Sequence, residues 1–241
     1  MTALQIELLK LKKLANYIML GLLLLLVVGV AAITFHQLNK MPEPPGVLLF
    51  WDMQASFVDL ILAIFIIMNI GKEYSDNTLR RTIIDGMTRD GFFKSKVLLL
   101  LLSVVVFYII PKIVLLTGGL ISGHSSEVNA YLTVPVIITS FIKILAAGIF
   151  AFFLAFVTRS IALGIVFYFV WGNVVESILV MLEKFFTTWT FDLKNYLPVA
   201  SVDAALNTNL AVEAQTIIIA SGYLLIMLVV PYILLLKRDI K

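Results

Sequence analysis

Six long apolar stretches constrain the fold of this chain more than any other feature of its sequence. Each is close to the twenty or so residues that an α-helix needs to cross the hydrocarbon core of a bilayer. They cover residues 17–35, 47–70, 97–117, 131–157, 161–182 and 216–236. Backbone polar groups in lipid must pair within the protein, and the alternating pattern of a membrane β-barrel is absent. We therefore expect an all-α polytopic membrane protein with six transmembrane helices.

The composition supports a bilayer as the solvent of this chain. Its 241 residues are 61% apolar and 14% charged, whereas soluble domains are about half apolar and about a quarter charged. We expect a single transmembrane domain over residues 1–241 and no soluble domain. The chain has no cysteine, which excludes disulfides, thiolate nucleophiles and cysteine-based metal sites.

The lysine and arginine residues indicate the orientation, because cytoplasmic loops carry the excess of positive charge. A cytoplasmic N-terminus places thirteen of them inside and four outside. The inner set is Lys10, Lys12, Lys13, Lys72, Arg80, Arg81, Arg89, Lys94, Lys96, Arg159, Lys237, Arg238 and Lys241. The outer set is Lys40, Lys112, Lys184 and Lys194. We expect both termini to be cytoplasmic, in a bacterial-type inner or plasma membrane.

Two further segments have the composition of a membrane interface. Residues 1–16 carry leucines at helical spacing with lysines off that stripe, which predicts an amphipathic interfacial helix. Residues 183–215 are rich in aromatic residues, too polar to span and too apolar for a free loop. Two interpretations stay open for this outer segment: a partly re-entrant, interfacial structure, or an ordinary loop with an aromatic belt.

Residues 71–96 concentrate charge in an otherwise apolar chain, with ten charged side chains among 26 residues. Leu79, Ile83 and Met87 recur at helical spacing and predict a short amphipathic helix, which Gly86 would end. Thr88 is placed to cap the helix that follows. Positive charge here could serve topology alone or bind anionic lipid. The acidic side chains mixed among the basic ones favour a surface that docks another protein.

The same stretch resembles a known family. The order Glu73, Asn77-Thr78-Leu79, Thr88-Arg89 and Lys96 is similar to the first cytoplasmic loop of the membrane (permease) subunits of ABC transporters of the type-2 exporter family. The layout is similar too, with an interfacial N-terminal helix, six spans and a partly inserted segment before the sixth.

This resemblance implies that residues 71–96 form a cytoplasmic coupling loop whose helix sits in a cleft on a separate ATPase subunit. Leu79, Ile83 and Ile84 would then fill the cleft, and Arg80, Arg81 and Asp85 would line its rim. Glu73 and Arg89 would brace the loop to itself. The resemblance further implies an exporter with two ATPase subunits, which bind ATP and Mg²⁺, and a second permease chain, identical or homologous.

The chain lacks the motifs of an enzyme. Gly71-Lys72 has neither the preceding glycine nor the following Ser or Thr of a phosphate-binding loop. There are two histidines, and no zinc-protease motif or nucleophile elbow. We expect no catalysis, cofactor or metal in this chain, and no nucleic-acid binding.

Three charged residues fall inside predicted spans: Asp59, Lys143 and Glu176. Each costs about 2.5–3.5 kcal/mol at the centre of a membrane helix. They could line a substrate path or a dimer seam, but an internal ion pair or snorkelling is the favoured interpretation, with an acidic partner for Lys143. The leading hypothesis is an ABC exporter permease. The alternatives are an ion-coupled secondary transporter that uses these charges, and a non-transporting scaffold or immunity-type membrane protein.

Overall fold

The computed structural model describes residues 17–18, 21–22, 24–29, 32–33, 47–76, 78–122, 133–185, 196–205 and 214–237. Within these ranges the regular structure is helical, and no strand occurs. Four helices in the described ranges are long and apolar enough to cross a membrane, at Arg89–Val114, Val134–Thr158, Ile161–Leu179 and Ile217–Lys237. The expected all-α membrane architecture is confirmed at this level, and the count of six spans stays a prediction.

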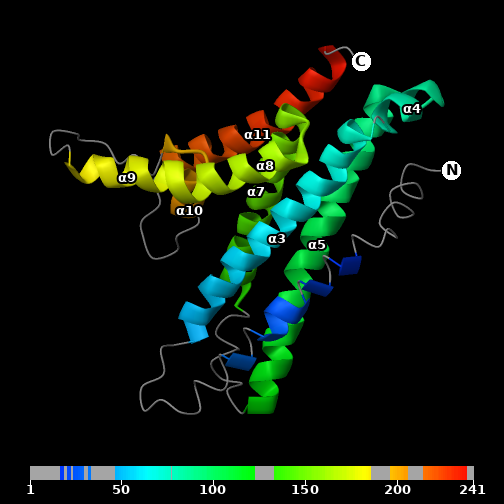
Figure 1. Cartoon of the computed structure of the whole chain (residues 1–241). Helices are drawn as coiled ribbons and strands as arrows, with labels where there is room; N and C mark the ends of the chain where they lie inside the picture. Colours follow the sequence, from blue (N-terminus) through cyan, green and yellow to red (C-terminus); the bar gives the residue numbers. More distant parts are fainter. Residues whose placement is uncertain are drawn as a thin grey trace.

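Three long helices form one side of the molecule (Figure 1). Helix α3 runs over Val47–Ser75, α5 over Arg89–Ser122 and α7 over Val134–Thr158. The short helix α4, Thr78–Ile84, lies between α3 and α5 in the sequence and at one end of the bundle.

The second half of the chain forms one broken helix, one short helix and one long helix. Helix α8, Ile161–Phe169, continues through the π-helix η1, Val170–Val175, into α9, Glu176–Phe185. The short helix α10 covers Ala200–Ala205, and α11 covers Ala214–Lys237. In Figure 1, α9 and α11 lean away from α3 and α5, and α11 returns to the end of the bundle that carries α4.

Helix α7 is the centre of the packing. It packs against α3, α5, α8, α10 and α11, and its Ala151, Phe152 and Ala155 are fully buried. Lipid is as apolar as these side chains, so close van der Waals packing rather than the hydrophobic effect holds such helices together.

Glycines allow the closest helix approaches. A Cβ added to Gly71 of α3 would lie 2.9 Å from Cγ1 of Ile161, and one added to Gly164 of α8 would lie 2.8 Å from Cγ2 of Ile67. Each helix therefore presents a glycine to an isoleucine of the other. Small residues at such interfaces let the backbones approach, as is common between membrane helices.

The helix boundaries differ from the expected spans mainly at residues 71–96. This stretch is not one separate loop, because α3 continues to Ser75 and α5 already begins at Arg89. The helical structure at the expected fifth span extends to Phe185 through the π-helix. The interfacial helix expected at 1–16 lies outside the described residues, as do parts of the first span and of residues 183–215.

Candidate functional site

Helix α4 ends in a well-defined turn that fixes its direction. The N–H of Gly86 donates to the carbonyl of Ile83, and the N–H of Met87 donates to that of Thr82. These two bonds are those of a Schellman cap. Gly86 has a φ of +98°, a conformation that costs glycine little and other residues more. The helix stop predicted at Gly86 is confirmed.

The start of α5 is capped as its sequence predicts. The N–H of Gly91 donates to Oγ1 of Thr88 at 3.1 Å, the bond of an N-cap side chain to the third residue of its helix. Asp90 lies in the first turn, where a negative charge complements the helix dipole. Helices α4 and α5 are thus joined by a short connection with defined backbone geometry at both ends.

Helix α4 has an inner and an outer face. Leu79 is buried, and Ile83 and Met87 are partly buried against the same core. Ile84 is 72% exposed, and Arg80, Arg81 and Asp85 are exposed beside it. The expectation that Leu79 fills a partner's cleft therefore needs correction. Its side chain points into its own bundle, because that face of α4 packs on the core. Ile84 is the apolar side chain that α4 offers to a partner.

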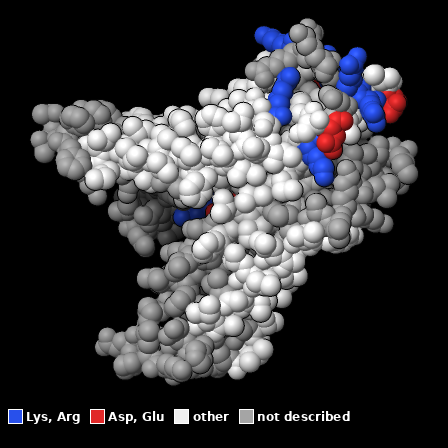
Figure 2. Space-filling model, in the orientation of Figure 1, with Lys and Arg blue, Asp and Glu red and all other residues white. Residues whose placement is uncertain are grey.

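Charged side chains of both signs gather at this end of the molecule (Figure 2). They lie over α4 and near the end of α11, whereas most of the described surface elsewhere on this face is uncharged. The one small exception is a basic and acidic group in the middle of the view. A mixed-charge surface around one exposed apolar side chain is suited to docking a protein, since rim charges set orientation and partner choice.

A buried ion pair anchors the base of α4. Nζ of Lys96 lies 2.6 Å from Oε1 of Glu73, and the two side chains are 1% and 7% exposed. The ammonium also lies 5.2 Å from the centre of the Phe92 ring. The brace expected from Glu73 is present, but its partner was not foreseen. The side chain of Lys96 turns inward to this carboxylate rather than outward to the lipid headgroups.

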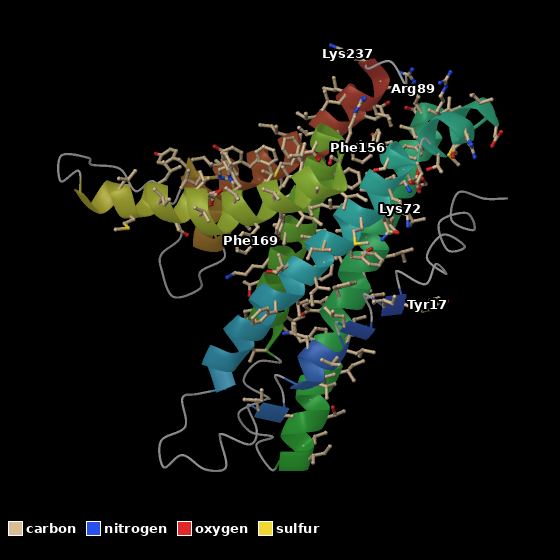
Figure 3. The ribbon with its side chains drawn as sticks, in the orientation of Figure 1. Tyr17, Lys72, Arg89, Phe156, Phe169 and Lys237 are labelled. Carbon is tan, nitrogen blue, oxygen red and sulfur yellow. The ribbon has the colours of Figure 1, made fainter. Side chains whose placement is uncertain are left out.

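Arg89 braces a different element from the one expected. Its Nη1 atom donates to the carbonyl oxygens of Leu235 and Leu236, at 3.1 and 2.5 Å. These residues belong to the last turn of α11, so Arg89 connects the start of α5 to the last helix rather than to its own loop. Figure 3 shows Arg89 next to the end of α11 that carries Lys237.

The turn between α7 and α8 packs close to the same region. Arg159 adopts a φ of +52° at the end of α7, and its N–H donates to the carbonyl of Ala155. Its guanidinium lies 5.3 Å from the centre of the Tyr74 ring, near the end of α3. Tyr74 in turn stacks edge-on against Phe156 of α7. The ends of α3 and α7 are therefore joined by aromatic and cation–π contacts.

Glu176 is a structural acceptor. Its side chain is buried, and Oε1 accepts hydrogen bonds from Nε1 of Trp171 at 2.8 Å and from the N–H of Val199 at 2.9 Å. Oε2 accepts from the N–H of Ala200 at 2.7 Å. The π-helix brings Trp171 and Glu176 together, because residues five apart are neighbours in its wider turn. The carboxylate thereby fixes the start of α10.

Asp59 and Lys143 lie on α3 and α7, two helices that pack extensively against each other. Asp59 interacts electrostatically with Tyr168 of α8, and Lys143 also has an interaction partner. The structure does not bring Glu176 into a shared ion pair with Asp59 and Lys143: the hydrogen bonds described for its carboxylate go to Trp171 and to α10. An acidic partner for Lys143 stays a prediction.

The sequence reasoning did not single out Tyr232, and it named Arg89 without identifying its partner on α11. Tyr232 donates its hydroxyl to Oδ1 of Asp90 at 2.9 Å, and nothing in the pattern of α11 singles this tyrosine out. The signal for Arg89 was present but unused: an arginine at a helix start opposes that helix's dipole, and so favours the carboxyl end of another helix.

The comparisons with known proteins agree with the layout of the chain. The sequence model of the family described as ABC-2 family transporter protein matches residues 3–182. The matched range includes α4 and the ion pair between Glu73 of α3 and Lys96 of α5, and it ends within α9. No curated protein and no solved structure matches the chain.

Proposed function

This chain belongs to the ABC-2 family of transporter proteins and acts as a membrane permease, and we propose that a separate ATPase subunit docks on its helix α4. ATP binding and hydrolysis take place in that subunit, where ATP and Mg²⁺ are held. Two permease chains and two ATPase subunits form the exporter, since six spans are too few to enclose a sizeable path alone.

One observation carries this proposal: α4 presents Ile84 on a rigid base. The side chain is 72% exposed on a helix whose opposite face is buried at Leu79. The Glu73–Lys96 pair and the Schellman turn hold that helix at its two ends. A docking helix has to be rigid to transmit force, because a loosely held one would move without displacing the spans.

The arrangement of the helices supports a common cytoplasmic side for α4 and the C-terminus. The start of α5 contacts the end of α11 through Arg89, and four candidate spans lie between the two points. An even number of crossings returns the chain to its starting side. The basic residues of this end favour the cytoplasmic side of an inner or plasma membrane.

The segment around α10 supports a partly re-entrant outer structure. Val202 packs with Ala146, in the middle of α7, and with Ala220, near the start of α11. Because α10 contacts α7 at its middle and α11 beyond its first turn, α10 lies alongside these two helices rather than past their ends. We propose that α10 dips into the outer leaflet, held there by Glu176.

The docking proposal is tested with a tagged chain purified in mild detergent. We expect an ATP-binding protein to co-purify, Ile84→Asp to reduce its recovery at least tenfold, and Ile84→Leu to retain it. Membrane insertion and yield should not change, because Ile84 contributes little to the core. Ile83 is a poorer probe, since it packs on the core and its substitution would also affect folding.

Charge reversal on the same helix separates docking from general electrostatics. Arg80→Glu with Arg81→Glu should weaken recovery of the ATPase, whereas Lys94→Glu, an exposed lysine of α5, should not. Undiminished recovery from both α4 variants would refute docking on this helix. Ion-driven transport without any ATP-binding partner would instead support a secondary carrier, and neither partner nor transport would support a scaffold.

A further inference from the structure

We propose that six residues at the junction of α5 and α11 form a latch that makes the last helix move together with α4. The latch consists of Arg89, Asp90 and Phe93 on α5, and of Tyr232, Leu235 and Leu236 on α11. The inference rests on the docking of an ATPase on α4, and it assigns to the last span a part in the coupling movement. Three of the six residues lie on α11, which is outside the family match and outside the predicted coupling loop.

The first component of the latch is a helix end capped by a distant arginine. The last carbonyl groups of an α-helix have no partner within it, and its carboxyl end carries a partial negative charge. Helix α11 ends at Lys237, so the carbonyls of Leu235 and Leu236 are in that position. Arg89 supplies both the hydrogen bonds and the positive charge from another helix.

The second component is a hydrogen bond in the opposite direction, from a donor on α11 to an acceptor on α5. Oδ1 of Asp90 accepts the hydroxyl hydrogen of Tyr232 at 2.9 Å. Asp90 also lies at the amino end of α5, where its negative charge complements the dipole. Asp90 therefore stabilises the amino end of its own helix, whereas the neighbouring Arg89 stabilises the carboxyl end of α11.

An aromatic contact completes the latch. The rings of Phe93 and Tyr232 lie 5.2 Å apart and are inclined at 57°. Phe93 also packs edge-on against Phe152 and Phe156 of α7, which connects the latch to the centre of the bundle. Elsewhere α11 packs mainly against α7 and α10, so the latch is the polar link between α11 and the helix that follows α4.

The position of the latch determines what it can transmit. Arg89 is five residues beyond Ile84, and the Schellman turn and the Thr88 cap leave little freedom between them. A displacement of α4 therefore reaches the start of α5, and through three contacts it reaches the end of α11. Without the latch, the position of α11 would depend on α7 and α10.

The experiment measures one distance in the complete complex with and without nucleotide. The natural absence of cysteine allows spin labels at Asp76→Cys and Lys237→Cys, two sites outside the latch, without further background changes. With the latch intact, we expect a narrow distance distribution that ATP with vanadate leaves unchanged. A single label at Asp76→Cys reports, through the distance between two permease copies, whether nucleotide moves this end at all.

The latch variant combines Arg89→Ala with Tyr232→Phe, which removes the polar contacts and keeps the ring of residue 232. We expect its distance distribution to broaden at rest and to shift when nucleotide moves α4. Tyr232→Phe alone should give a smaller broadening. It keeps the test decisive if the double variant does not fold. Lys94→Ala, which removes an exposed positive charge from the same helix, should behave as the unmodified chain.

The outcomes separate this inference from the proposed function. A latch variant whose distribution matches that of Lys94→Ala, with and without nucleotide, would overturn the latch. A narrow distribution that shifts with nucleotide in the unmodified chain would also overturn it, because α11 would then move separately. If no ATPase co-purifies and nucleotide changes nothing, the proposed function fails, while broadening at rest would still support the latch as a link.

Discussion

Lys96 of α5 and Glu73 of α3 form an ion pair inside the helix bundle, with 2.6 Å between Nζ and Oε1. The pair joins the helices that flank α4, from positions that are 23 residues apart in the sequence. Two charges withdrawn from water are costly individually, and their attraction offsets that cost only while both are present. The pair therefore makes the position of α4 depend on the packing of two long helices.

The first prediction concerns this pair. Lys96→Met should destabilise the chain by about 3–5 kcal/mol, because it leaves a buried carboxylate without its counter-charge. The double variant Glu73→Met with Lys96→Met should be more stable than Lys96→Met, since no buried charge then remains at this position. Thermal unfolding in detergent measures both, and Lys94→Met serves as an exposed control with a change within about 0.5 kcal/mol. Additive losses in the double variant would contradict a direct pair.

The second prediction concerns the glycine contacts between α3 and α8. Gly164→Ala should lower the melting temperature, because its new methyl group would lie 2.8 Å from Cγ2 of Ile67 and push the helices apart. Gly222→Ala in α11 meets no atom within 4 Å, and alanine favours helix by about 1 kcal/mol over glycine. The control should therefore be neutral or stabilising. Equal melting temperatures for the two variants would show that the α3–α8 interface has room to adjust.

The third prediction concerns the turn that ends α4. Gly86→Ala should destabilise the chain by about 1 kcal/mol, because its φ of +98° strains any residue with a Cβ. Gly86→Asn should lose less, since asparagine tolerates left-handed conformations better. No atom crowds the site, so the difference reports backbone conformation alone. Unfolding experiments on the three proteins give the order, and Ala at least as stable as Asn would contradict it.

The fourth prediction concerns the hold of Glu176 on α10. In a chain with Ser201→Cys, which replaces a fully buried serine of α10, a maleimide should label residue 201 slowly. Adding Glu176→Ala should raise the labelling rate at least about tenfold, because a hydrogen bond to a charged group contributes about 1.5–3 kcal/mol. Glu176→Gln, which retains one acceptor oxygen, should fall between. Unchanged labelling in Glu176→Ala would mean that packing of Val202 alone holds α10.

The local features of the site were predictable because they depend on residues close together in the sequence. The short helix, its stop at Gly86 and the Thr88 cap follow from propensity, a left-handed turn and one side-chain oxygen. The family resemblance assigned Leu79 to a partner, and the apolar stripe could not correct it, because a stripe does not say which of its residues face the protein's own core. Only the packing of α4 on the bundle separates Leu79, inside, from Ile84, outside.

The sequence by itself determined that this chain is a helical membrane protein, because apolar length and backbone hydrogen bonding leave lipid-embedded segments little choice. It also located the charged segment that carries α4. Tertiary structure alone decided the partners of the charges: Lys96 with Glu73, Arg89 with the carbonyls of α11, and Glu176 with the amides of α10. Those pairings join residues from 23 to 147 positions apart, and which of them meet depends on how the helices pack, which local periodicity does not encode.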